Sequence, residues 1–306
     1  MILSTILPVF LVIFLGWVVR KQKFIPDEFI GPANQLVYYI AIPAMIFRAV
    51  ASASVHEVFD ITLLGLTLST VFITFAATWL ATTAAGISLK TKGTFVQSAF
   101  HGNLGYIGLA VVFYYLGAPG LASAGIFAGF IMIFQNILAI CVLQVNGAKA
   151  NHKGTSLLAN IRRILVHPVI LASVSGILVS AANLPIPLIA ERTLDIISGM
   201  ALPLALLLIG ATLSFEVIRT HLARVAWASL IKLIAMPGVG LLLFQCWAIP
   251  REKFLPVFIL LCAPSATLTY VMAKEMKGDT EFAVAVVSAC TMLSALGFGM
   301  WLHFLS

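Results

Sequence analysis

Residues 101–108 read HGNLGYIG and residues 262–268 read CAPSATL, and these two stretches decide the fold. Each of them interrupts a long apolar run. The first holds three glycines and an asparagine within eight residues, and the second holds a proline followed by two hydroxyl residues. A helix that breaks inside a bilayer frees main-chain N–H and C=O groups, which protein or enclosed water must satisfy. The two stretches therefore predict a pair of discontinuous membrane helices.

The composition places these stretches in an integral membrane protein. The chain is 61% hydrophobic and 9% charged over 306 residues, whereas a soluble domain is about 45–50% apolar and about 25% charged. Too few charges are present to cover a soluble protein of this size, so the remaining apolar surface faces lipid. The net charge of +7 is spread between apolar runs, which argues against a nucleic-acid-binding patch. The four cysteines lack CxxC spacing and predict packing, without a metal or redox site.

Ten apolar segments are long enough to cross a bilayer, which needs about 20 residues of helix. They are residues 1–19, 32–52, 60–84, 94–116, 121–145, 164–182, 193–213, 222–246, 254–273 and 280–304. In the first segment the apolar run precedes its positive charges, which is the reverse of a cleaved signal peptide, so we expect this helix to be retained. The sequence thus predicts an all-α integral membrane protein with ten transmembrane helices.

The lysines and arginines assign the two sides of the membrane. The odd-numbered connections between the ten segments hold thirteen of these residues, and the even-numbered connections with their edges hold four. Cytoplasmic loops collect lysine and arginine. We therefore expect the odd connections in the cytoplasm, both termini on the extracytoplasmic side, and a multi-pass protein of the cell (inner) membrane.

A shift of 160 residues aligns the two halves of the chain and lays the fourth segment over the ninth. The matching positions are Pro8 with Pro168, Gly16 with Gly176, and Pro43 with Pro203. Because each half holds five spans, an odd number, the second half enters the membrane from the opposite side. The sequence predicts five-helix repeats over 1–145 and 164–306, joined by a cytoplasmic connecting loop at 146–163. Such inverted repeats are typical of secondary transporters.

In folds of this kind the substrate site forms where discontinuous helices cross near the midplane. Two half-helix N-termini would aim main-chain N–H groups and partial positive charge at the crossing, which suits a carboxylate. The expected binding residues come from the two interruptions and from the span after the first: Asn103, Gly105, Tyr106, Asn136, Pro264, Ser265 and Thr267. The alternative is that the small residues only allow close helix packing, and that the amides Asn34, Gln97, Gln135 and Asn136 join helices.

Lys232 is the only lysine or arginine deep inside a predicted span. A cation at the bilayer centre costs about 2.5–3.5 kcal/mol on insertion scales, so it should face a cavity or a partner. We expect Lys232 to balance the charge of an anionic substrate or to exchange a proton during transport; the alternative is a structural lysine at a helix C-terminus. His101 is the second candidate for proton coupling, with a hydrogen-bonded structural histidine as its alternative. Mid-membrane carboxylates are lacking, which disfavours sodium coupling, and we expect no metal site and no cofactor.

Four strings, taken in their order and spacing, resemble the auxin efflux carrier family, meaning the plant PIN carriers and their bacterial relatives. They are NQLVYYIAIPAMIF at 34–47, NLGYIG at 103–108, KLIAMP at 232–237, and Ala263-Pro264 followed by the turn that contains Gly278. The resemblance covers nearly the whole chain. It implies a fold like that of sodium/bile-acid symporters, with crossed, broken helices 4 and 9 and an elevator or rocking movement.

The resemblance also implies an organic-anion substrate: auxin in plants, and malonate, malate or lactate in the bacterial members. The family's usual proline at the fourth-helix crossing is absent from Gly102-Asn103-Leu104, which is a departure in the carboxylate site. The short central loop favours the bacterial type.

The predicted function is secondary active transport of small carboxylates by alternating access, driven by protons or by the substrate's own gradient. A channel or a ligand-sensing module without a transport cycle is the alternative. An enzyme is disfavoured, because the sequence lacks an HExxH motif, a metal cluster and paired intramembrane aspartates. The expected partners are a small-molecule carboxylate and the lipid bilayer, without nucleic acid. The substrate, the direction of flux, the coupling ion and a homodimeric state stay open.

Overall fold

The computed structural model describes residues 2–53, 59–146 and 168–306, and its regular elements are all helices. Six helical stretches are long and apolar enough to cross a membrane, by length and composition. The predicted all-α membrane fold is confirmed, while the count of ten spans stays a prediction. Residues 147–163 of the predicted connecting loop, and 164–167 of the sixth segment, lie outside the described residues.

The elements follow the predicted segments closely. The first half contains α1 (Ile2–Lys21), α2 (Asp27–Leu36), η1 (Val37–Ala41), α3 (Ile42–Ala51), α5 (Ile61–Ala84), α6 (Leu89–Phe100), η2 (Leu104–Gly108) and α7 (Leu109–Asn146). The second half contains α9 (Pro168–Ala181), α10 (Leu188–Gly199), α11 (Ala201–Thr212), η3 (Arg219–His221), α12 (Leu222–Leu230), η4 (Ile231–Ala235), α13 (Met236–Cys246), α14 (Arg251–Leu261), α15 (Leu268–Glu275) and α16 (Thr280–Leu305). Between the fourth and fifth predicted segments, α7 kinks at Gly117, whose φ of 71° suits a residue without a side chain.

Four helices, α2, α6, α10 and α14, begin three to five residues before the apolar runs that predicted them, and for α2, α10 and α14 the cause is visible in the sequence. Helices α2, α10 and α14 each follow a proline and carry an acidic residue in the first turn. Proline is favoured at the start of a helix, and negative charge stabilises a helix N-terminus. A search for apolar residues alone leaves out a first turn that contains charged residues, so it places the start of the helix too late.

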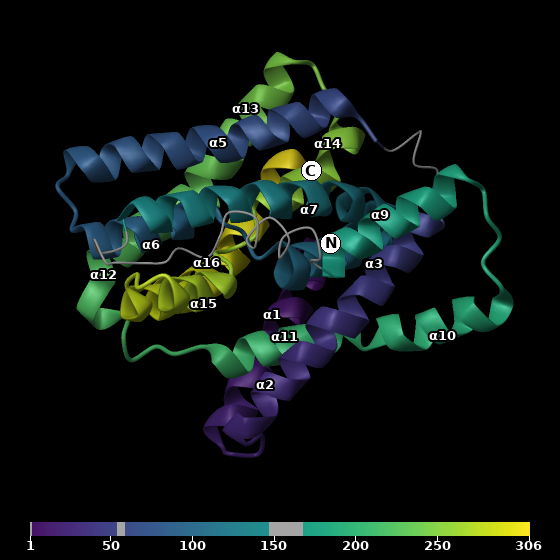
Figure 1. Ribbon diagram of the computed structural model, residues 1–306, viewed down its shortest axis with the longest axis horizontal. Coiled ribbons are helices and arrows are strands. Elements are labelled where there is room, and N and C mark those ends of the chain that lie inside the picture. The colour runs from purple at the N-terminus through teal and green to yellow at the C-terminus, as the bar shows by residue number, and fades with distance from the viewer. Residues whose placement is uncertain (1, 54–58, 147–167) are drawn as a thin grey trace.

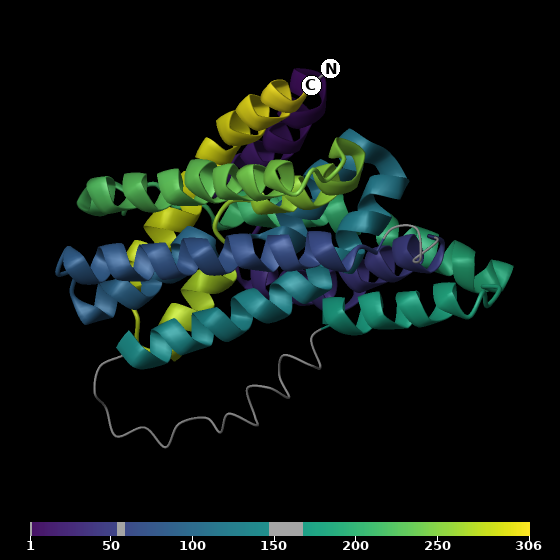
Figure 2. The same ribbon diagram turned by 90° about the horizontal axis from the view of Figure 1, so that it is seen from above.

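Helix α7 lies in the middle of the molecule and packs against α6, α14, α3 and α9 (Figure 1). Most of its side chains are buried. Figure 2 shows α1 and α16 side by side at the edge of the molecule, where they contact each other. The buried core therefore includes much of α7 and the parts of α6 and α14 that pack against it.

Helix α1 packs against α11, and α3 packs against α9, in the most extensive helix contacts of the described chain. A Cβ atom at Gly210 of α11 would overlap the main chain of α1, and one at Gly176 of α9 would lie 3.1 Å from the Phe47 carbonyl oxygen of α3. Glycine permits this close approach of two backbones. Under the shift of 160 residues, α1 falls on α9 and α3 falls on α11, so the two contacts are equivalent.

Candidate functional site

Both predicted interruptions are breaks between helices. Helix α6 ends at Phe100 and η2 begins at Leu104, while α14 ends at Leu261 and α15 begins at Leu268. The extended residues between these ends form an isolated antiparallel bridge. The breaks of the fourth and ninth segments therefore lie against each other.

Two main-chain hydrogen bonds join the breaks. The N–H of Asn103 donates to the carbonyl oxygen of Pro264 at 2.7 Å, and the N–H of Ala266 donates to that of His101 at 2.9 Å. Each bond uses a donor and an acceptor that no helix can satisfy at this point. The crossing is thus a short piece of β-ladder inside an all-helical protein.

Buried side chains satisfy further main-chain groups at the crossing. Gln135 of α7 accepts a hydrogen bond from the N–H of Gly102 at 3.2 Å and donates one to the Phe100 carbonyl oxygen at 3.0 Å. The hydroxyl of Ser265 donates to the Ser98 carbonyl oxygen at 2.7 Å. Unpaired main-chain groups would be costly in this apolar interior. Gln135 and Ser265 therefore hold the breaks in place.

The helix ends at the crossing include two N-termini. Asn103 is the N-cap of η2, since its side-chain oxygen accepts a hydrogen bond from the Tyr106 N–H at 3.3 Å. Thr267 is the N-cap of α15, without a side-chain capping bond. The amide nitrogen of Asn103 is buried and has no hydrogen-bond partner among the described residues. A buried donor of this kind favours a ligand that can accept a hydrogen bond.

A cavity of about 740 Å³ adjoins these two N-termini. The break segments line it with residues 101–106 and 266–268, and the α2–η1 stretch also contributes to the lining. The polar and aromatic side chains contributed by that stretch are Asp27, Asn34, Gln35, Tyr38 and Tyr39. The cavity therefore combines apolar walls with a few polar groups, as small-molecule sites do.

Most of the predicted site residues line this cavity: Asn103, Gly105, Tyr106, Asn136, Thr267 and the proton-coupling candidate His101. Pro264, Ser265 and Lys232 are not among the lining residues. Pro264 and Ser265 lie behind the lining, where they make the crossing's hydrogen bonds. His101 also contacts Gln97, with 3.3 Å between the ring nitrogen Nδ1 and the side-chain amide nitrogen.

Lys232 is fully buried and lies behind the crossing. Its ammonium donates to the carbonyl oxygen of Leu261, the last residue of α14, at 2.8 Å. A Cβ atom added to Gly102 would lie 3.4 Å from the ammonium nitrogen, so Lys232 packs directly against this glycine. A cation at a helix C-terminus is electrostatically favourable. At the crossing, the N-termini of η2 and α15 therefore adjoin the cavity. Lys232 lies on the other side of Gly102, at the C-terminus of α14.

Sequence reasoning missed two contributions to the cavity. Arg20 was counted only as a loop charge, yet it is the one lysine or arginine that lines the cavity in the described chain. Asn34 was considered only as an amide that joins helices, and its side-chain oxygen lies 3.5 Å from the Tyr106 hydroxyl. The spacing of Asn34 and Tyr38, four residues apart on one face of a helix, was the available signal.

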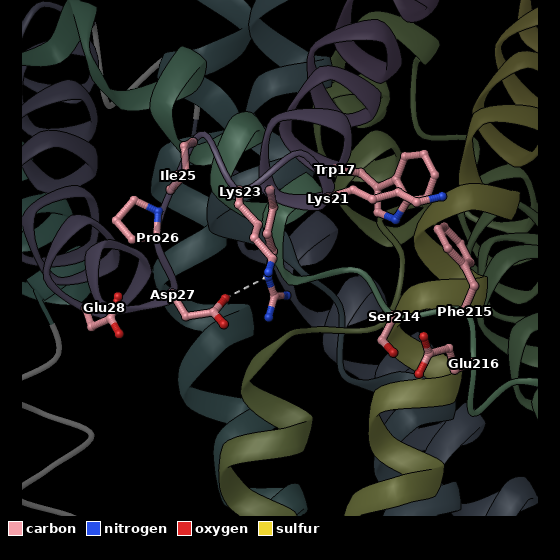
Figure 3. Close-up of a pocket in the computed structure, with 11 residues that line it drawn as sticks. Trp17, Lys21, Lys23, Ile25, Pro26, Asp27, Glu28, Ser214, Phe215 and Glu216 are labelled. Atoms are coloured by element: carbon pink, nitrogen blue, oxygen red, sulfur yellow. Dashed lines mark hydrogen bonds and ion pairs between the residues drawn. The ribbon is translucent and has the colours of Figure 1, made fainter.

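A second hollow of about 670 Å³ lies at the end of α1, and we call it the vestibule. Figure 3 shows its lining, which comes from α1, the turn before α2, the first two residues of α2, and residues 214–216 after α11. The vestibule and the cavity share Arg20, Asp27 and Ser214. The two hollows therefore meet at these residues.

Comparison with known proteins gives a consistent result. The family model "Membrane transport protein" matches residues 1–302. The "Putative malonate transporter" of Rhizobium meliloti is 25% identical over 304 residues, covering 96% of this chain and 92% of the relative. An "Uncharacterized transporter" of Methanothermobacter thermautotrophicus is 25% identical over 302 residues, covering 97% and 96%. The "Hepatic sodium/bile acid cotransporter" of Rattus norvegicus is 30% identical over 110 residues, covering 35% of this chain and 30% of the relative.

Proposed function

Since the chain belongs to the membrane transport protein family that includes the auxin efflux carriers, we propose that it is a secondary carrier of small organic carboxylates that works by alternating access. The family is one of multi-pass membrane transporters, and the described helices fit that setting. The substrate class, the side of each terminus and the inner-membrane location belong to the proposal.

The unpartnered amide of Asn103 is the observation that supports this proposal most strongly. It lies at the N-terminus of η2, beside the N-terminus of α15, and lines the cavity. Leaving a buried donor unsatisfied costs about 1–3 kcal/mol, which a carboxylate oxygen would recover on binding. The partial positive charge of both helix N-termini favours the same ligand. The Tyr106 and Thr267 hydroxyls and the Asn136 amide supply further polar groups in the lining.

In this proposal, Lys232 supplies a fixed positive charge on the side of Gly102 that faces away from the cavity. It would stabilise a bound anion through space, because the lysine does not line the cavity. Proton exchange at Lys232 or His101, or the substrate's own gradient, would then drive net flux. The contact between Lys232 and the end of α14 favours the fixed-charge role, since the ammonium already has an acceptor.

Two equivalent helix contacts support the inverted repeats that alternating access needs. The α1–α11 and α3–α9 contacts exchange under the shift of 160 residues, and the helices of the second and seventh segments depart from regular α-helix at corresponding places, η1 and Met200. We extend this to repeats over 1–145 and 164–306, with ten spans in all. If the end of α1 lies in the cytoplasm, as the loop charges predict, the vestibule and cavity open toward the cytoplasm.

Malonate is the first substrate to test, because it appears in the name of a relative that matches nearly the whole chain. The purified protein in liposomes should exchange external labelled malonate for internal unlabelled malonate. Such counterflow requires a carrier with one alternating site, whereas a channel or a sensor does not produce it. A panel of malate, lactate and indole-3-acetate would then define the substrate class.

Asn103→Asp tests the site itself. Aspartate keeps the size and the N-capping oxygen of asparagine, but it replaces the N–H₂ donor with a negative charge that repels an anion. We expect this variant to fold and to lose counterflow of every carboxylate. Asn183→Asp, in an exposed turn, is the matched control and should retain it. Normal counterflow by Asn103→Asp would refute the proposed site.

A further inference from the structure

We propose that Arg20 captures the substrate's carboxylate at the mouth of the cavity by exchanging its ion-pair partner Asp27 for the substrate. This inference rests on the proposed carboxylate transport and assigns a second, outer binding step to it. Arg20 then sets how well the carrier collects substrate at low concentration, while the crossing holds the anion during translocation.

The position of Arg20 is the first reason for this assignment. The residue lines both the vestibule and the cavity, and among the described residues it is the only lysine or arginine that reaches the cavity. Its guanidinium is held by the carbonyl oxygen of Ala211 in the last turn of α11. The Nε atom pairs with an Asp27 carboxylate oxygen at 3.0 Å, drawn as the dashed line in Figure 3. Because both residues line both hollows, the pair lies where the vestibule and the cavity meet.

The exposure of the pair makes the exchange easy. The side chains of Arg20 and Asp27 are 38% and 75% exposed. Solvent screens such an ion pair, so breaking it is nearly neutral in free energy. A guanidinium has five N–H donors and binds carboxylates in a planar, two-pronged manner. A substrate carboxylate can therefore take the place of Asp27 while the Ala211 contact keeps the guanidinium in position.

The rest of the vestibule does not act as a general attractor of anions. Its charged lining is balanced, with three basic and three acidic side chains: Arg20, Lys21, Lys23, Asp27, Glu28 and Glu216. The ammonium of Lys21 lies over the ring of Trp17, 4.8 Å from its centre. Selection at the entrance therefore depends on the basic side chain that continues into the cavity, rather than on the net charge of the surface.

The distance to the crossing separates capture from final binding. Asp27 and Asn34 are seven residues apart on α2, which corresponds to about 10 Å along a helix. Asn34 in turn contacts Tyr106, which follows Asn103 by three residues. A short dicarboxylate such as malonate is too small to reach Arg20 and Asn103 together. The two residues would bind the anion one after the other.

Substitutions of the two partners of the ion pair should shift the half-saturating malonate concentration in opposite directions. In Arg20→Gln the entrance loses its guanidinium, so the half-saturating concentration of labelled malonate should rise roughly threefold to tenfold, with the maximal rate kept within about twofold. In Asp27→Asn the competitor for Arg20 disappears, so the half-saturating concentration should fall about twofold or more. Lys21→Gln removes a vestibule charge that does not reach the cavity, and it should change this concentration less than about twofold.

The experiment measures malonate exchange from the cytoplasmic side in liposomes of neutral lipid, together with malonate-induced thermal stabilisation of the purified protein at low salt. Neutral lipid removes binding of anionic headgroups to the basic side chains. A purely structural ion pair would make Arg20→Gln and Asp27→Asn shift the half-saturating concentration in the same direction, with equally lowered melting temperatures, and this result would overturn the inference.

The two readouts separate this inference from the proposed function. Counterflow in the wild type with an unchanged half-saturating concentration in Arg20→Gln would overturn capture by Arg20 and leave the carrier function intact. Arg20-dependent thermal stabilisation without counterflow would support capture and refute the carrier function. If the wild type shows neither stabilisation nor exchange with any carboxylate of the panel, both are wrong.

Discussion

Replacing Lys232 with methionine removes a buried charge that touches the crossing while keeping a side chain of similar length. The ammonium packs against Gly102, whose other side lines the cavity. With Gly102 in van der Waals contact, at about 3.5 Å, on both sides, a carboxylate there would lie on the order of 7 Å from the ammonium. At an effective dielectric constant of about 20, two unit charges at this separation interact by about 2 kcal/mol. The Lys232→Met variant should therefore bind malonate about thirtyfold more weakly.

The stability of Lys232→Met should change much less than its affinity. The substitution leaves the Leu261 carbonyl oxygen without its 2.8 Å partner, which costs about 1–3 kcal/mol. It also removes the penalty of burying an ammonium, which acts in the opposite direction. The melting temperature in detergent should consequently stay within a few degrees of the wild type.

Lys92→Met is the matched control for this prediction. Lys92 is also buried, and its ammonium donates to the Thr83 hydroxyl at 2.6 Å, but it does not line the cavity or touch the crossing. Equilibrium malonate binding and counterflow should be near the wild-type values in this variant. If Lys232→Met and Lys92→Met bind malonate equally well and as well as the wild type, the through-space charge has no role.

Three further substitutions test the packing and the lining. Gly210→Ala would drive a Cβ into the main chain of α1, so it should destabilise the protein by about 1–3 kcal/mol in thermal unfolding, whereas Gly199→Ala meets open space and should not. Ser265→Ala removes the 2.7 Å bond to the Ser98 carbonyl at the crossing and should lower stability by about 1–3 kcal/mol; an unchanged melting temperature would show that the bond is dispensable. Tyr106→Phe loses a hydroxyl whose protein contact, at 3.5 Å, is weak. It should raise the half-saturating malonate concentration about threefold to tenfold at constant melting temperature, and equal kinetics would place the substrate elsewhere.

The sequence was sufficient to predict the two breaks, because glycine, asparagine and proline clustered inside an apolar run disfavour a continuous helix. Asn103 and Thr267 could be predicted as lining residues for the same reason, since both follow the helix break directly and cap the next helix. The match between the fourth and ninth segments at one shift predicted that the breaks would meet. The main-chain bonds between them agree with this.

The location of Lys232 could not be predicted from sequence. A lysine in mid-span indicates a buried cation, but the side of the crossing on which it lies depends on how α12, η4 and α13 pack against α14. Gln135 illustrates the same limit: its sequence position indicated an amide that joins helices, but not which groups it joins, and it bonds to the break at Gly102. Arg20 was missed because a charge at the end of a span also fits a simple topological role. Such assignments depend on tertiary contacts between distant segments.

A structure of the protein with bound malonate tests the central claim most directly. We expect a carboxylate oxygen to lie about 2.7–3.1 Å from the side-chain nitrogen of Asn103. We expect further contacts to main-chain N–H groups at the N-termini of η2 and α15. Malonate bound away from this crossing, with the Asn103 amide still unpartnered, would contradict the account.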